Sequence, residues 1–169
     1  MEITSSNVAN ILLEGAAFCS FSFGCNFSLS FECKRREDMN LPFSICLSIE
    51  GDWWFGDENE WKRTVSEMTA NRNCIEPEEP ALAFQLAALR WSSGSTISHV
   101  NLSADKLEIQ FVSGQCITIL NQICDEGECA WEIIECSYDN ELSGDYWWVS
   151  CDRNGSINYN IPSTYNQLI

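Results

Sequence analysis

The regular alternation of apolar and polar residues over 97–120 constrains the fold of this chain more than any other feature. In ISHVNLSADKLEIQFVSGQCITIL, the apolar residues Leu107, Ile109 and Phe111 are separated by single polar residues. This period of two is typical of a strand with one buried face. Turn-forming residues interrupt it at 103–106 and at 113–114, so the segment predicts a three-stranded antiparallel meander.

Further strands are predicted on both sides of this meander. Alternating segments occupy 17–23, 27–33 and 43–49 before it, and 130–136, 146–151 and 156–161 after it. The last two flank Asp152-Arg153-Asn154-Gly155, in which Asn-Gly favours a tight hairpin turn.

Three helices are also expected. Ser5 or Ser6 can cap a short helix over 7–13. A second is predicted over 57–69, where apolar residues recur at helical spacing. A third starts near Pro80 and continues to Trp91, with leucines along one face.

The order of these elements predicts an α+β, β-rich fold made of two related halves that form one body. Residues 1–70 supply a helix and antiparallel strands, and residues 81–169 supply a second such set. Residues 71–80 contain two prolines and three glutamates and are interpreted as a linker. The repeated order suggests a duplication. Chance recurrence and a single continuous domain are the alternatives.

The charge of the chain restricts its partners. Twenty-five acidic residues against nine lysines and arginines give a net charge of −16. Such a chain is not expected to bind nucleic acid, because that requires cations to neutralise phosphates. It would attract a basic protein and accelerate the encounter. The alternative is that the charge serves solubility alone.

Localisation and cofactors are predicted from what the sequence lacks. MEITSSNVAN has neither the basic start nor the apolar run of a signal peptide, and no apolar stretch reaches the roughly 18 residues of a membrane span. We therefore expect a cytoplasmic chain with no membrane partner. Its ten cysteines are expected to be reduced, and several of them to pack as small core residues. Without a C-x-x-C pair, no metal or other cofactor is predicted.

The sequence also contains little that indicates a catalytic site. His99 is the only histidine, and it lies in a strand pattern opposite apolar residues. No phosphate loop, nucleophile elbow or zinc-protease motif is present. We therefore predict no catalytic residues and no enzyme activity. A catalytic pair of carboxylates is the alternative, because the distance between two carboxylates depends on the fold and not on their positions in the sequence.

Two similar segments combine acids with aromatic residues: Gly51-Asp52-Trp53-Trp54 and Gly144-Asp145-Tyr146-Trp147-Trp148. Adjacent residues of a strand face opposite sides, so one tryptophan of each pair can lie in the core and the other at the surface. An exposed tryptophan beside carboxylates suits a protein partner rich in Arg and Lys. A sugar platform and an entirely structural role are the alternatives. The predicted partner-binding residues are Asp52, Trp53, Trp54, Asp57, Glu58, Glu60, Asp125, Glu126, Glu128, Asp139, Glu141, Asp145, Trp147 and Trp148.

One part of the chain resembles a known group of proteins. The segment LRWSSGSTISHVNLSADKLEIQFVSGQCITI, followed by Ala130-Trp131-Glu132-Ile133, is similar to small bacterial immunity proteins of polymorphic toxin systems, including contact-dependent growth inhibition. The shared pattern is an apolar helix, a strand, L-x-I/L-x-F-x-x-G-x-x-L/I-x-I and a Trp-centred strand. The pattern covers about a third of the chain. It does not identify any functional residue in this chain.

The resemblance implies a protein that binds and blocks one cognate toxin. With the net charge of −16, it predicts a non-enzymatic immunity protein for a basic toxin domain such as a nuclease. A small enzyme or ligand-binding domain with a carboxylate–tryptophan cleft is the first alternative, and a structural subunit of a homo-oligomer is the second. The sequence does not indicate an oligomeric state.

Overall fold

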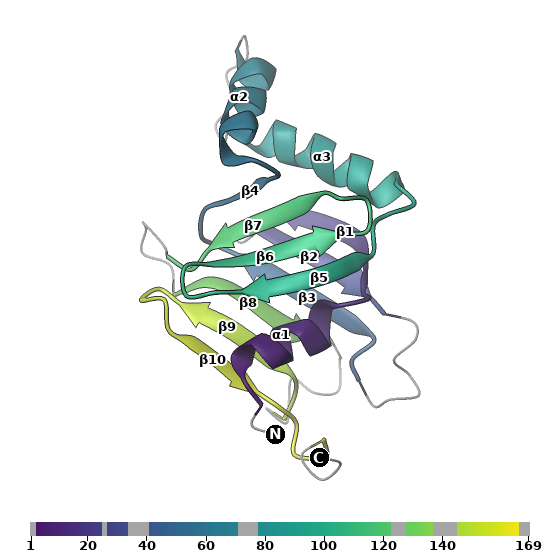
Figure 1. Ribbon diagram of the computed structural model, residues 1–169, viewed down its shortest axis with the longest axis vertical. Helices are drawn as coiled ribbons and strands as arrows, with labels where there is room; N and C mark the ends of the chain where they lie inside the picture. The colour runs from purple at the N-terminus through teal and green to yellow at the C-terminus, as the bar shows by residue number, and fades with distance from the viewer. Residues whose placement is uncertain are drawn as a thin grey trace.

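The computed structural model describes residues 3–24, 27–33, 41–70, 78–122, 128–136 and 145–165. Two antiparallel sheets lie face to face, with the smaller one in front in Figure 1. The larger sheet has the order β1 (Ala17–Phe23), β2 (Phe27–Glu32), β3 (Ser44–Ile49), β8 (Cys129–Glu135), β9 (Trp148–Asp152) and β10 (Ile157–Asn160). The smaller sheet has the order β4 (Trp53–Phe55), β7 (Cys116–Leu120), β6 (Lys106–Phe111) and β5 (Ile97–Leu102). The prediction of a strand-rich α+β fold is confirmed.

The predicted meander forms β5, β6 and β7. Val100 pairs with Ile109, and Ile109 pairs with Ile117 on the next strand. All three side chains are buried, because residues paired directly across neighbouring strands lie on the same face of the sheet. Gly114 has a φ of 84°, which suits the tight turn between β6 and β7.

Each sheet takes strands from both predicted halves of the chain. β4 belongs to the first half but pairs with β7 of the second half. Conversely, β8 belongs to the second half but pairs with β3 of the first half. The buried side chains of the two sheets form one hydrophobic cluster. Residues 71–77 of the predicted linker lie outside the described residues, and 78–80 lead into the third helix.

The chain passes from one sheet to the other between β3 and β4. The backbone N–H groups of Glu50 and Gly51 both donate to the carbonyl oxygen of Ala130, at 3.0 and 2.9 Å. The N–H of Leu120 donates to the carbonyl oxygen of Asp52 at 2.9 Å. A Cβ at position 51 would lie 3.2 Å from the carbonyl oxygens of Leu120 and Gln122, so this crossing favours glycine.

The helices cover the two open ends between the sheets (Figure 1). α1 (Ser5–Leu13) packs against β5 of the smaller sheet and β8, β9 and β10 of the larger one. Its N-cap is Thr4, whose hydroxyl accepts from the N–H of Asn7 at 3.3 Å; the predicted Ser5 and Ser6 lie in the first turn instead. α2 (Glu58–Thr69) packs against β4 and α3, and α3 (Glu79–Trp91) packs against β1.

A fully buried asparagine joins elements from both sheets. The side-chain amide of Asn121, which follows β7, donates to the carbonyl oxygens of Ser103 and Ala104 at 3.0 and 3.1 Å. Its Oδ1 accepts from Nε1 of Trp131 on β8 at 2.8 Å. These bonds satisfy polar groups that would otherwise destabilise the core.

Among the described helices, none is both long and apolar enough to cross a membrane.

Candidate functional site

Carboxylates from five segments form two groups, one around Lys62 and one around Cys129, and the crossing at residues 50–52 contributes one acid to each. We call the two groups together the acidic surface; it consists of Glu50, Asp52, Glu58, Glu78, Glu128, Glu132 and Asp152. Five of these residues are exposed, whereas Glu132 and Asp152 are half-buried.

One part of the acidic surface surrounds Lys62 on α2. Its Nζ lies 2.6 Å from Oε1 of Glu58, and this contact raises the pKa of the lysine; Asp52 and Glu78 act in the same direction. Lys62 therefore contacts one carboxylate and is influenced by the negative charge of two more.

The other part surrounds Cys129 at the start of β8. Burial raises the pKa of this thiol, and the charges of Glu132, Glu50, Glu128 and Asp152 raise it further. Burial, followed by the charge of Glu50, also raises the pKa of Glu132. For both side chains, the nearby negative charge adds to the larger effect of burial.

Of the residues predicted from sequence, Asp52, Glu58 and Glu128 lie on the acidic surface. Asp57 is the N-cap of α2, where its carboxylate accepts from the N–H groups of Asn59 and Glu60 at 2.9 and 3.1 Å. Glu60 is exposed in the first turn of the same helix. The predicted residues Asp125, Glu126, Asp139 and Glu141 lie outside the described residues.

The structure identifies Trp53 and Trp147, both predicted to bind a partner, as the inward tryptophans of their pairs. Trp53 is only 9% exposed and stacks on Phe27, and Trp147 is 2% exposed and packs edge-on against Tyr165. Their neighbours Trp54 and Trp148 are half-buried, and Trp54 still packs against the edge of the core. Alternation predicted one inward tryptophan in each pair but could not identify it.

Asp145 has a structural partner and lies away from the acidic surface. Its carboxylate accepts from the hydroxyl of Ser163 at 2.6 Å and from the backbone N–H of Ser163 at 2.9 Å, and these bonds lower its pKa. Asp145 precedes β9, whereas Asp152 ends it beside Cys129. The structure therefore does not join the two acid–tryptophan segments into one site.

A groove lined by aromatic residues borders the acidic surface. Its volume is about 450 Å³, and its lining consists of Phe23, Gly24, Phe27, Trp53, Glu78, Glu79 and Leu82. Sequence reasoning missed the contribution of the two phenylalanines, which lie at the end of the β1–β2 pair. It also missed four acids of the acidic surface: Glu50, Glu78, Glu132 and Asp152. No local pattern distinguishes these acids from others, because their proximity arises from pairing between distant strands.

A larger groove of about 970 Å³ lies between α1, β1 and the end of α3. Its charged lining residues are Glu14, Glu32 and Arg90. Nε of Arg90 donates to the carbonyl oxygen of Cys19 at 2.6 Å, which ties α3 to β1. Neither Asp52 nor Asp145 lines this groove or the aromatic one, so neither groove is the carboxylate–tryptophan cleft considered from sequence.

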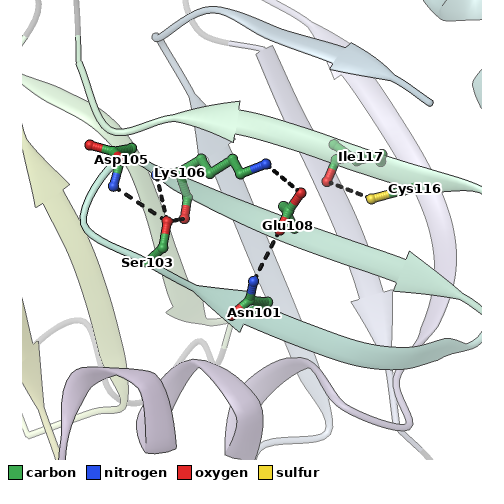
Figure 2. A network of polar contacts seen from close by, with 7 residues as sticks. All are labelled: Asn101, Ser103, Asp105, Lys106, Glu108, Cys116 and Ile117. Carbon is green, nitrogen blue, oxygen red and sulfur yellow. Dashed lines mark hydrogen bonds and ion pairs between the residues drawn. The ribbon is translucent and has the colours of Figure 1, made fainter. Parts of the chain in front are cut away.

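The outward face of the smaller sheet carries a polar network (Figure 2). Glu108 accepts from Nζ of Lys106 at 2.7 Å and from Nδ2 of Asn101 at 3.0 Å. The contact with Lys106 is the main cause of the lowered pKa of Glu108. His99 is exposed on β5. These contacts orient the side chains on the surface of the sheet.

The outward face of the larger sheet carries a pair of thiols. Cys46 on β3 and Cys136 after β8 are hydrogen-bonded to each other, and this bond lowers the pKa of Cys46 to about 7. Cys46 also neighbours Ile134, which in turn pairs with Trp148. Within the described ranges, no group of three or more His, Cys, Asp or Glu side chains is arranged to hold a metal ion.

No family model, no curated protein and no solved structure matches this chain.

Proposed function

We propose that this chain is a non-enzymatic, cytoplasmic immunity protein that binds and neutralises a basic toxin domain, with a nuclease as the expected type of toxin. The observation that carries the proposal is the convergence of acids from separate elements on one acidic surface, in a chain of net charge −16. The similarity of residues 89–133 to immunity proteins supports the same conclusion.

The physical basis is electrostatic complementarity. A nuclease presents cations where it binds the phosphates of nucleic acid. Carboxylates held close together by the folded chain can occupy the same positions, and they require little reordering on binding. The half-buried position of Glu132 strengthens its electrostatic contacts, because a charge near the protein interior is less screened by water.

The proposal predicts tight, salt-sensitive binding to a toxin domain encoded immediately upstream of this gene. Isothermal titration calorimetry should give a dissociation constant in the nanomolar range at about 50 mM NaCl, and binding should weaken at least about tenfold at about 300 mM. The same complex should block the activity of the toxin. If no complex forms at low salt, the proposal is wrong.

Charge reversal locates the interface. Asp52→Lys combined with Glu128→Lys should weaken binding by at least about a hundredfold, since both changes place a cation opposite a basic partner. The control combines Glu67→Lys with Asp105→Lys, two exposed acids outside the acidic surface, and changes the net charge equally. Equal losses for both pairs would indicate attraction by net charge alone.

A further inference from the structure

The floor of the aromatic groove is a series of rings in contact. The ring centroids of Phe23 and Phe27 are 5.0 Å apart, and those of Phe27 and Trp53 are 4.5 Å apart with an interplanar angle of 19°. Phe23 is 38% exposed, so at least one ring of the series is accessible from solvent. The packing of Phe27 on Trp53 joins the two sheets, which holds the floor in place.

Two carboxylates lie at the rim of the same groove. Glu78 and Glu79 at the start of α3 are both exposed, and Leu82 on the next turn is the apolar wall beside them. Acids at a helix N-terminus also complement the helix dipole, which explains their place on α3. That dipole does not account for the accessible aromatic rings in the same groove.

The combination of aromatic rings and carboxylates selects a cation with a flat, apolar face. The negative face of an aromatic ring attracts a cation, and carboxylates pair with it. A guanidinium group satisfies both, because it is planar, stacks on rings and donates two parallel hydrogen bonds to a carboxylate. An ammonium group is more strongly hydrated and lacks a flat face. A volume of about 450 Å³ is ample for one such side chain.

We propose that the aromatic groove binds an arginine side chain of the basic partner. The identity of the partner rests on the proposed function, whereas the chemistry of the groove does not. Glu78 belongs to both the groove and the acidic surface, so an arginine seated here would be continuous with the electrostatic interface. Arginine is also among the residues most often responsible for binding energy at protein interfaces.

A pair of small probes tests the groove without any toxin. N-acetyl-argininamide and its neutral isostere N-acetyl-citrullinamide are titrated separately into the full chain, and the indole N–H resonance of Trp53, assigned with Trp53→Phe, is followed by NMR. The arginine probe should shift this resonance with a millimolar dissociation constant, and the citrulline probe should bind at least about tenfold more weakly. Equal binding of both probes, or no shift with the arginine probe, would overturn the inference.

Matched variants distinguish binding in the groove from the general effect of removing an exposed phenylalanine or two negative charges. Phe23→Ala should weaken binding of the arginine probe about fivefold, and Phe43→Ala is its control, because Phe43 is also 38% exposed but does not line the groove. Glu78→Gln with Glu79→Gln should weaken binding to a similar degree, and Glu67→Gln with Asp105→Asn removes the same charge elsewhere. Losses of equal size in the control variants would also overturn the inference.

The two proposals can fail separately. If the arginine probe binds and no toxin complex forms, the groove is correct and the proposed function is wrong. If the toxin binds but its affinity is unchanged by Phe23→Ala and by the double glutamine variant, the function stands and the groove is not part of the interface.

Discussion

Asp52-Trp53-Trp54 and Asp145-Tyr146-Trp147-Trp148 are similar in sequence but differ in the structure. In the first segment, the acid is exposed on the acidic surface and the inward tryptophan is part of an accessible groove. In the second, the acid is bound to Ser163 and the inward tryptophan packs against Tyr165. Acid–tryptophan composition therefore predicts a strand end, but the partners of the acid decide whether it can bind another protein.

Replacement of the inward tryptophan of the second segment should have the largest effect on stability. Trp147→Ala removes a side chain that is only 2% exposed, and the resulting cavity should lower the free energy of unfolding by about 3–5 kcal/mol. Trp148→Ala, at the half-buried outward position, should cost less than about 1.5 kcal/mol. Urea unfolding monitored by circular dichroism measures both. A larger loss for Trp148→Ala would reverse the assignment of inward and outward residues.

The two aspartates should separate binding from stability. Asp52→Asn should weaken the toxin complex and leave the melting temperature unchanged, whereas Asp145→Asn should lower the melting temperature slightly and leave binding unchanged. The pKa of Asp145 is lowered by Ser163, so its stabilising contribution is present above the unfolded pKa of about 3.9. The contribution is lost as the pH falls through the folded pKa. Thermal melts from neutral pH to about pH 2.5 check this, and a pH-independent difference would contradict it.

Glu132 should behave in the opposite way from Asp145. Its pKa is raised by burial and by Glu50, so its ionisation costs stability as the pH rises above the unfolded value of about 4.3. Glu132→Gln should therefore stabilise the protein at neutral pH, on the order of 0.5 kcal/mol after allowance for screening. The gain should disappear below about pH 4, where the carboxyl is protonated in both states. A loss of stability at neutral pH would show that the charge of Glu132 is favourable in the fold.

The smallest effect on binding is expected at the thiol pair near Trp148. Cys46 has a pKa of about 7, whereas burial raises the pKa of Cys116, which is also half-buried. Iodoacetamide reacts with thiolates, so at about pH 6.5 it should label Cys46 before Cys116, as mass spectrometry would show. The labelled protein should bind the toxin with at most a slight loss of affinity, since Glu132 shares this face but most of the acidic surface lies elsewhere. A large loss would place the thiol pair itself in the interface.

Local pattern predicted most elements of the fold but not their assembly. The turns at 103–106 and 113–114 were visible because Leu107, Ile109 and Phe111 alternate so regularly. The exchange of β4 and β8 between the predicted halves could not be inferred, because strand alternation specifies a buried face and not a distant pairing partner.

Because distant strand pairing could not be predicted, the candidate site was predicted only in part. Asp52 and Glu128 were identified from charge, but Glu132 reads as an ordinary polar residue of a strand. Its relation to Glu50 depends on the pairing of Ile49 with Trp131, two residues that lie in different predicted halves of the chain. Phe23 and Phe27 read as core residues of a hairpin, and only the stacking of Phe27 on Trp53 reveals the groove.

The exchange of strands has a consequence for how the protein is made. β3 ends at residue 49, but its partner β8 begins at residue 129, so about 80 residues are synthesised between them. At roughly 5–20 residues per second, the open edge of β3 waits on the order of 4 to 16 seconds for its partner. During this interval the nascent chain presents unpaired backbone groups beside apolar side chains, a combination that favours association with other chains. Completion of the larger sheet is therefore a late event in biosynthesis, and a fragment that stops after α3 would keep this edge open.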